Sequence, residues 1–286
     1  MDHWTLDDNP WDHFDQSAVD AETIALVKAA CTVEHNGADY ATYLCNVFAD
    51  DDEFCHAARR WAMEEVQHGE VLRRWAEIAD PAFDFHGAFT RFTEGYQLML
   101  QATASVRGSR TGELIARCVV EVGTSSYYSA LADSTAEPVL VALCRRIAGD
   151  EFRHYKLFLD HMRRYQASER LGLWRRLQVA LGRLIESEDD ELAFAYYCGA
   201  HTVDTGDPAP DDRKRSIRTY GGRTLTLDRF GHVEQPLCAW CSKRSVSPPG
   251  DRSRPGQPPS PGSYYASAPA NWQPPRDVPL IRGQYT

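Results

Sequence analysis

Residues 61–72 read WAMEEVQHGEVL, and residues 147–158 read IAGDEFRHYKLF. In both stretches apolar residues recur at alternating steps of three and four, which is typical of an α-helix with one buried face. Each buried face also carries a glutamate that is followed three positions later by a histidine. Residues at this spacing lie one turn apart on the same side of a helix. Each stretch can therefore present a carboxylate and an imidazole to one ion.

The same periodicity extends well beyond these two stretches. About thirty residues, which include Pro81, separate the second long apolar pattern from the third, and we expect a further helix within 89–106. A connection of that length suits a crossover along a bundle. We therefore predict an all-α fold, a ferritin-like four-helix bundle of two antiparallel hairpins joined by a long crossover. The four long helices are expected over 17–49, 51–79, 109–134 and 138–166.

Each of the four predicted helices has a glutamate within its apolar face. Glu34 lies about sixteen residues before the turn near residue 50, and Glu65 about fifteen residues after it, so at ~1.5 Å per residue their depths match. Glu121 and Glu151 are each about fifteen residues from the turn near Ala136, which gives the same depth. We therefore expect six side chains to converge on one metal-binding pocket: Glu34, Glu65, His68, Glu121, Glu151 and His154.

Charge compensation decides between a structural and a metal-binding interpretation. An unpaired buried carboxylate costs several kcal/mol or takes up a proton, and no Lys or Arg stands at the facing positions of these helices. Two divalent cations would balance four carboxylates. Oxygen-rich ligands with one imidazole per metal favour iron, with manganese as the alternative. A single E-x-x-H is usually a solvent-facing pair, but two matched pairs with two further glutamates favour a dimetal site.

At these residues the chain resembles the ferritin-like di-iron carboxylate superfamily over about residues 17–166. Residues 64–69 and 150–154 look like the E-E-x-x-H-G and D-E-x-R-H motifs of soluble acyl-carrier-protein desaturases, and 121–124 matches their E-x-x-T. The resemblance implies the same six ligands, Asp150 as a hydrogen-bond partner of a ligand histidine, and Thr124 near the oxygen-binding face. Gln67 departs from those desaturases, which usually carry Arg there. Ribonucleotide reductase subunits have a Tyr where Leu72 stands.

These features predict an oxygen-dependent di-iron oxidoreductase. Two ferrous ions would activate dioxygen to desaturate or hydroxylate an organic substrate, either a small molecule or an acyl group on a carrier protein, with electrons from a donor such as a ferredoxin. Cys118, Tyr128 and Ile147 are candidates to line its cavity, although core packing is their more common role. The alternative is ferritin-like or rubrerythrin-like iron oxidation, storage or peroxide scavenging. A structural metal site in a helical interaction module is a third interpretation.

Composition restricts the partners and the location. A net charge of −10 argues against general affinity for nucleic acid. No apolar run approaches the roughly 18 residues that span a bilayer, and residues 1–16 lack the pattern of a signal peptide. We therefore expect a cytoplasmic protein without a membrane span. A homodimer is compatible with this composition.

The C-terminal part differs in character from the helical region. An amphipathic segment over 169–198 predicts a fifth long helix outside the bundle, so the helical domain is expected to cover 1–200. Residues 201–246 are interpreted as an accessory basic segment with helical potential. Ten of the 16 prolines fall within 247–286, which predicts a disordered tail. Of eight cysteines, only Cys238 and Cys241 form a C-x-x-C, which is a weak metal signal without a second pair.

Overall fold

The structure is a computed structural model that describes residues 3–187 and 191–200. Most of these residues are helical, and no β-strand occurs among them. The all-α prediction is therefore confirmed for this part of the chain. Three short 3-10 helices come first: Leu6–Asp8, Trp11–His13 and Gln16–Ala18. The α-helices are α1 (Ala21–His35), α2 (Gly37–Val47), α3 (Asp52–Ala79), α4 (Phe85–Gly95), α5 (Arg110–Ser134), α6 (Pro138–Glu169), α7 (Leu173–Ser187) and α8 (Glu191–Ala200).

The long helices begin where a polar side chain caps them. The Asp51 carboxylate accepts a hydrogen bond from the Phe54 N–H at 3.0 Å, and the Ser109 hydroxyl accepts one from the Gly112 N–H at 2.9 Å. Glu137 accepts two such bonds at the start of α6. These N–H groups have no acceptor within the helix, so a capping oxygen fixes where each helix starts. The predicted starts near 51, 109 and 138 agree with these caps.

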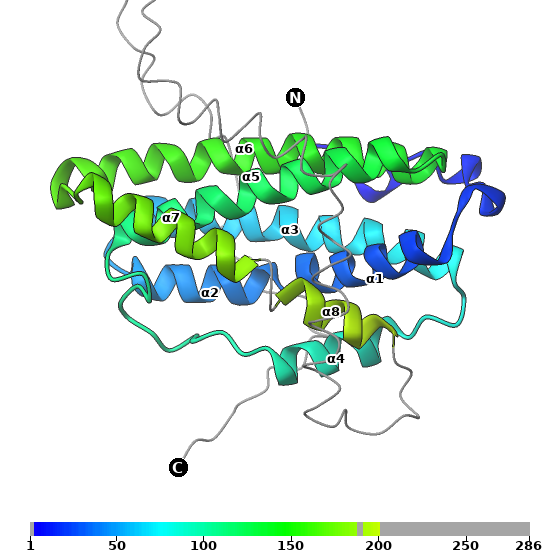
Figure 1. Cartoon of the computed structure of the whole chain (residues 1–286), viewed down its shortest axis with the longest axis horizontal. Coiled ribbons are helices and arrows are strands. Elements are labelled where there is room, and N and C mark those ends of the chain that lie inside the picture. Colours follow the sequence, from blue (N-terminus) through cyan, green and yellow to red (C-terminus); the bar gives the residue numbers. More distant parts are fainter. Residues whose placement is uncertain (1–2, 188–190, 201–286) are drawn as a thin grey trace, which may run out of the picture. The chain divides into compact units, whose positions relative to one another are not determined.

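Two helical hairpins support the predicted site (Figure 1). Residues 135–137 connect α5 to α6, and these two helices pack along each other. Residues 48–51 connect α2 to α3, and α3 packs against both α2 and α1. Contacts between α3 and α6 join the two hairpins. That these helices constitute a ferritin-like four-helix bundle stays a prediction.

Apolar residues fill the interior on both sides of the polar centre. Along α3, Phe54 and Trp61 belong to one buried cluster, and Leu72 and Trp75 belong to another. The polar ligand candidates of α3 lie between these two clusters in sequence. The apolar residues that recur at steps of three and four along α3 and α6 are buried: Phe54, Ala58, Trp61, Leu72, Trp75, Ala79, Leu140, Cys144, Ile147 and Phe158. The helices are thus held together by apolar packing on both sides of the site.

The predicted helix over 17–49 is wrong in one respect. It is broken at Asn36 into α1 and α2, directly after Glu34 and His35. Two glycines explain the close packing at this break. A Cβ on Gly37 would lie 2.6 Å from the Cβ of Glu65, and a Cβ on Gly69 would lie 2.7 Å from the backbone nitrogen of His35. The break and both glycines let α1 and α2 approach α3 beside the ligand candidates.

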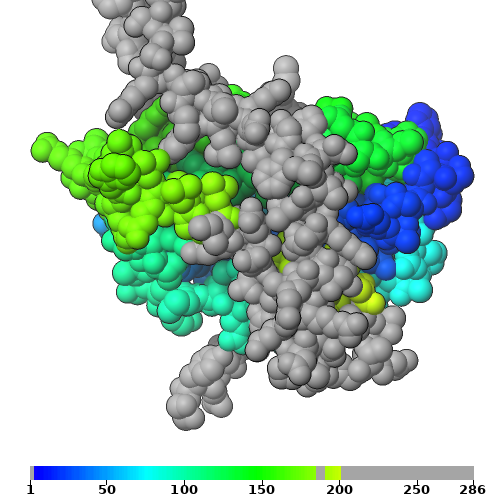
Figure 2. All heavy atoms as spheres, viewed as in Figure 1, coloured from blue at the N-terminus to red at the C-terminus, as the bar shows by residue number. Residues whose placement is uncertain are grey.

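The remaining helices cover the hairpins. The predicted crossover helix exists, but as α4, which starts before residue 89 and ends at Gly95. The predicted fifth helix corresponds to α7, which packs on α5, and α8, which packs on α1 and α4. In Figure 2, α7 and the N-terminal residues coloured blue lie toward opposite ends of the long helices. The predictions for 201–246 and 247–286, including Cys238 and Cys241, fall outside the described residues.

Candidate metal centre

The structure brings all six predicted ligand residues together from four helices. Glu34 comes from α1 and Glu121 from α5, while α3 and α6 each supply an E-x-x-H pair. Every one of the six side chains is buried, with residue exposures between 0% for His68 and 8% for Glu65. The matched depths inferred from the turns are therefore correct. The assignment of these residues as ligands stays a prediction, which their geometry now allows us to examine.

Their potential ligand atoms form two groups that share two carboxylates. One group contains Glu34 and His68, the other contains Glu121 and His154, and both contain Glu65 and Glu151. Within each group, one ligand atom per residue lies within 4.8 Å of all the others. Each of two ions bound in this way would have one glutamate and one imidazole of its own. The two ions would share the remaining two carboxylates.

Both imidazoles turn the same ring nitrogen toward the centre. The Nδ1 atom of His68 lies 3.1 Å from Glu151 Oε1 and 3.7 Å from Glu34 Oε2. The Nδ1 atom of His154 lies 2.9 Å from Glu65 Oε1 and 3.6 Å from Glu121 Oε2. Nδ1 can therefore act as the metal ligand on each ring, and Nε2 is left to bind an outer partner.

The atoms that face the centre make close imidazole–carboxylate contacts, but none of them forms a hydrogen bond of normal geometry. Buried polar groups in proteins are nearly always hydrogen-bonded, so a cluster of exceptions needs an explanation. Metal coordination supplies one, because oxygen and imidazole donors of this kind suit iron or manganese. The residues present thus fit a pair of divalent ions. The unpartnered atoms are Glu34 Oε2, Glu65 Oε1, His68 Nδ1, both carboxylate oxygens of Glu121, Glu151 Oε1 and His154 Nδ1.

Electrostatics within the metal-free centre point the same way. Burial, and then repulsion from Glu151 and Glu34, raise the pKa of Glu65 well above its ordinary value. Burial raises the pKa of Glu121 to about 8. Burial opposes a charge on His68, but the surrounding carboxylates outweigh it and raise the pKa of that imidazole. The metal-free centre therefore retains protons near neutral pH, and bound cations would displace them.

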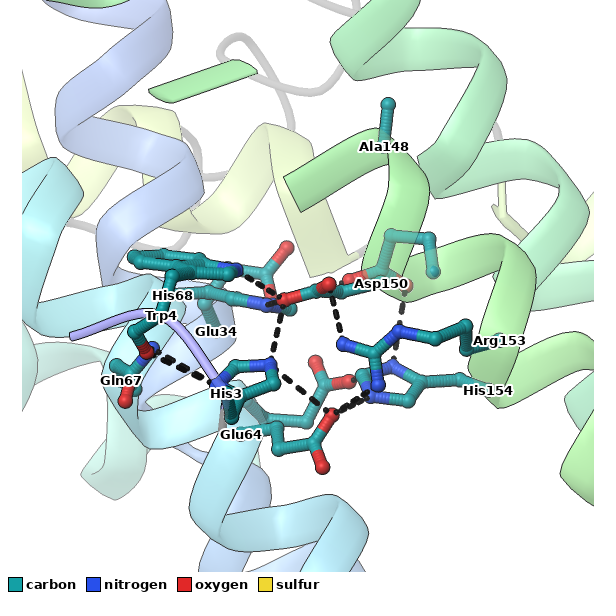
Figure 3. Close-up of polar contacts among 12 residues, drawn as sticks. His3, Trp4, Glu34, Glu64, Gln67, His68, Ala148, Asp150, Arg153 and His154 are labelled. Carbon is teal, nitrogen blue, oxygen red and sulfur yellow. Dashed lines mark hydrogen bonds and ion pairs between the residues drawn. The ribbon is translucent and has the colours of Figure 1, made fainter. Parts of the chain in front are cut away.

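Two outer carboxylates hold the imidazoles in a crosswise arrangement (Figure 3). Asp150, which precedes Glu151 on α6, accepts a hydrogen bond from Nε2 of His68 on α3 at 3.1 Å. Glu64, which precedes Glu65 on α3, accepts one from Nε2 of His154 on α6 at 2.9 Å. Carboxylates in this position fix ring orientation and increase ligand basicity. The structure thus places Asp150 in the position that the family resemblance implied.

Thr124 lies beside Glu151, one of the two shared carboxylates. Its hydroxyl donates a hydrogen bond to Glu151 Oε2 at 2.7 Å, across from α5 to α6. One oxygen of this shared carboxylate is therefore held by a hydroxyl, while the other, Oε1, has no hydrogen bond. Thr124 lines the cavity described below. Its proximity to an oxygen-binding face stays a prediction.

The sequence analysis missed an N-terminal contribution to the centre. Trp4 donates its indole N–H to Asp150 Oδ2 at 2.8 Å and stacks on His68, with ring centroids 6.0 Å apart and an interplanar angle of 9°. Nε2 of His3 lies 3.0 Å from the same oxygen, as Figure 3 shows. Arg153 pairs with both Asp150 and Glu64. No helical periodicity covers residues 3 and 4, so only their aromatic and polar character could have drawn attention.

Glu64 was assigned no role in the centre, and Tyr128 was considered only as a candidate to line the cavity. Glu64 stands in the quoted motif, and its position one residue before a ligand candidate parallels that of Asp150. This parallel with Asp150 could have identified Glu64 from the sequence as a hydrogen-bond partner of a ligand histidine. Tyr128 is 1% exposed and donates its hydroxyl hydrogen to Glu34 Oε1 at 2.6 Å. It therefore orients Glu34 and leaves Oε2 of that carboxylate to face the centre.

A cavity adjoins the centre. It is partly open to solvent. Cys118, Tyr128 and Ile147, which were candidates for the lining, are not among its lining residues, and all three are buried. Their long apolar surfaces pack the core instead. The lining residues are Val33, Glu34, Gly37, Tyr40, Trp61, Glu65, Arg117, Val120, Glu121, Thr124, Glu151, Arg183 and Glu191.

Comparisons with known proteins do not identify a family. No family model matches the chain, and no curated protein matches it either. None of the described helices combines the length and the apolar character needed to cross a bilayer. The six cysteines in the described residues are free thiols, and five of them are buried.

Proposed function

We propose that this chain is a ferritin-like, oxygen-dependent di-iron oxidoreductase. The proposal depends mainly on one observation, the convergence of six buried side chains whose possible ligand atoms form two groups that share two carboxylates. These side chains are Glu34, Glu65, His68, Glu121, Glu151 and His154. Four helices must be aligned to bring them together, and each unpartnered group would cost stability if nothing bound there. Two irons are proposed as the cofactor, with manganese as the alternative.

The protein's own residues would hold the ions and limit their surroundings. Glu65 and Glu151 could help to hold both ions, since they belong to both groups, and each remaining glutamate and histidine could hold one of them. When bound, a pair of ferrous ions supplies electrons for the reduction of dioxygen. The Asp150 and Glu64 carboxylates would keep both imidazoles in place. Thr124 would orient the shared carboxylate of Glu151. Apolar clusters on both sides would exclude bulk water.

The adjoining cavity favours oxidation of an organic molecule over iron storage. Both shared carboxylates line it, so a ligand in the cavity would lie directly beside the ions. We propose that the reaction is a desaturation or hydroxylation supplied with electrons by a partner such as a ferredoxin.

The test combines metal analysis with oxygen uptake. The full chain, loaded with ferrous iron under anaerobic conditions and desalted, is expected to retain two irons and to consume oxygen when a reductant is supplied. Glu65→Ala should retain neither iron and should show only background uptake, because Glu65 belongs to both ligand groups. Glu77→Ala is the matched control, since Glu77 lies on the same helix and is partly exposed.

Three results would oppose the proposal. The first is an equal iron content in the wild-type protein and in Glu65→Ala, and the second is the absence of bound iron in both. The third is oxygen uptake that does not differ between the two proteins. Retention of many irons per chain, with a mineral product, would instead support the storage alternative.

A further inference from the structure

The cavity beside the metal centre contains a buried arginine, Arg117, that makes no ion pair. Arg117 is 8% exposed and lies on α5 one turn before Glu121. Its guanidinium stacks over the ring of Tyr40, with 4.6 Å between Cζ and the ring centroid. Its Nε atom is buried and has no hydrogen-bond partner. A buried cation without a partner is costly, which suggests that another group completes this site.

The carboxylates nearest to Arg117 are already engaged or lie too far away for an ion pair. Burial opposes the charge on Arg117, but the neighbouring Tyr40 and three carboxylates outweigh it and raise the pKa of the guanidinium. The carboxylates are Glu113 and Glu121, one turn to either side on α5, and Glu191 on α8. None of the three forms an ion pair within 4.0 Å with Arg117. Glu113 accepts hydrogen bonds from two hydroxyls, and Glu191 accepts one from Tyr40 at 2.5 Å. Longer-range attraction therefore keeps Arg117 charged and leaves its donors available.

A second buried donor lines the same cavity. Trp61 on α3 is 4% exposed, and its indole Nε1 has no hydrogen-bond partner. Its ring packs edge-on against His154 and Phe158, which fixes its position. Arg183 also lies in the lining. The cavity thus offers N–H donors from opposite hairpins and needs a ligand that supplies acceptors.

We propose that this cavity binds a small organic carboxylate, with Arg117 as the anchor of its carboxylate group and Trp61 as a second donor. This inference rests on the proposed function and specifies its substrate class. A planar guanidinium matches the two oxygens of a carboxylate, and such charge-assisted pairs are about twice as strong as neutral hydrogen bonds. The remainder of the ligand would lie along Val120 and Thr124, beside the shared carboxylates.

The location of Arg117 explains why a small acid fits better than a carrier-bound acyl chain. Four residues separate it from Glu121, so at ~1.5 Å per residue the anchor lies only ~6 Å along α5 from the centre. A thioester carries no anionic group that would enter so far into the cavity. A free carboxylate would satisfy both buried donors and hold the adjacent carbons close to the ions.

Calorimetric titration of the full, metal-loaded chain tests the proposal. The probes are benzoate and hexanoate, and their neutral amides, benzamide and hexanamide, are the matched controls. We expect both acids to bind at least 10-fold more tightly than their amides. Arg117→Met, which keeps the stem that packs on Tyr40, should weaken binding of the acids by about 10- to 100-fold and leave the amides unchanged. Trp61→Phe should weaken the acids by about 3- to 10-fold.

Further variants separate a specific anchor from a general effect of charge. Arg163→Met removes an exposed arginine of α6 and should leave every affinity unchanged. Arg117→Lys keeps the charge but loses the planar fork, so acid binding should be intermediate. If Arg117→Met does not fold, Arg117→Lys and Trp61→Phe provide the test. Equal binding of acids and amides, no binding of acids, or unchanged acid affinity when Arg117 or Trp61 is altered would overturn the proposal.

The metal content of the same samples distinguishes the two proposals. Acid binding that persists in Arg117→Met but disappears when the metal is removed would mean direct coordination to the ion and would also contradict the anchor. Normal iron content without acid binding would overturn only the substrate class. Acid binding in a protein that takes up no iron would support the anchor and refute the di-iron function.

Discussion

The two hairpins supply equivalent ligands but hold them differently. In the first, the helix that carries Glu34 is broken at Asn36, and Gly37 and Gly69 allow close approach to α3. In the second, α5 and α6 are continuous, and a Cβ on Gly149 would meet nothing within 4 Å. The first hairpin thus reaches the centre by close backbone packing, and the second by two regular helices. A symmetric set of ligands does not require a symmetric scaffold.

The outer carboxylates show the same asymmetry. The side chain of Asp150 is 7% exposed and receives hydrogen bonds from Trp4 as well as from His68. The side chain of Glu64 is 21% exposed and binds His154 and Arg153. Tyr128 also orients Glu34, while both oxygens of Glu121 lack hydrogen bonds. The metal position beside Glu34 and His68 is therefore the more rigidly preorganised of the two.

The largest expected effect separates shared from unshared ligands. Glu151→Ala removes a carboxylate from both groups and should abolish binding of both irons, whereas Glu121→Ala should leave about one iron per chain, at the more rigid position. Elemental analysis of iron-loaded, desalted protein measures this difference. Equal iron content in the two variants would contradict the shared role of Glu151.

Substitution of the outer carboxylates should have a smaller effect on metal affinity. Loss of such a partner typically weakens metal binding by about 10- to 100-fold. We expect Asp150→Asn to lie near the upper end of this range and Glu64→Gln near the lower end, because Asp150 is more buried and holds an additional N–H donor. Competition with a chelator measures both affinities. A greater loss in Glu64→Gln would reverse the proposed order of rigidity.

How far the site could be predicted depended on periodicity. Glu65, His68, Glu151 and His154 stand within long regular helices, so spacing and distance from a turn fixed both their face and their depth. Trp4 and His3 precede the first helix and reach Asp150 through a chain path that no local pattern describes. Arg117 was missed for a different reason, because burial of its long side chain depends on packing by α2, α7 and α8. The break at Asn36 depends on contact with α3.

The glycines offer a test of stability rather than of metal binding. Gly37→Ala and Gly69→Ala should each destabilise the protein by about 1–3 kcal/mol, because the new Cβ meets a side-chain carbon or the backbone below 3.0 Å. Gly149→Ala is the matched control in the second hairpin and should stabilise by about 0.5–1 kcal/mol. Urea denaturation of each variant measures these changes. If Gly149→Ala destabilised the protein while Gly37→Ala and Gly69→Ala did not, the proposed difference in packing between the two hairpins would be contradicted.

A further expected effect is a dependence of stability on pH. In the metal-free protein the pKa of Glu121 is raised to about 8 from 4.5, so the folded state holds a proton that the unfolded state has released. The stability of the metal-free protein should therefore fall as the pH rises through that interval, and bound metal should remove the loss. The increase in Tm on metal loading should be larger at about pH 8 than at about pH 6. Glu121→Gln should make the increase in Tm on metal loading more similar at the two pH values. An unchanged pH dependence in this variant would contradict the role assigned to Glu121.

The convergence of six side chains on two ions can be tested most directly by anomalous X-ray scattering at the iron edge, using crystals of the iron-loaded chain. Our interpretation predicts two peaks, one beside Glu34 and His68 and the other beside Glu121 and His154, with Glu65 and Glu151 in contact with both. A single peak, a peak outside these residues, or no peak in crystals of protein exposed to ferrous iron would contradict it.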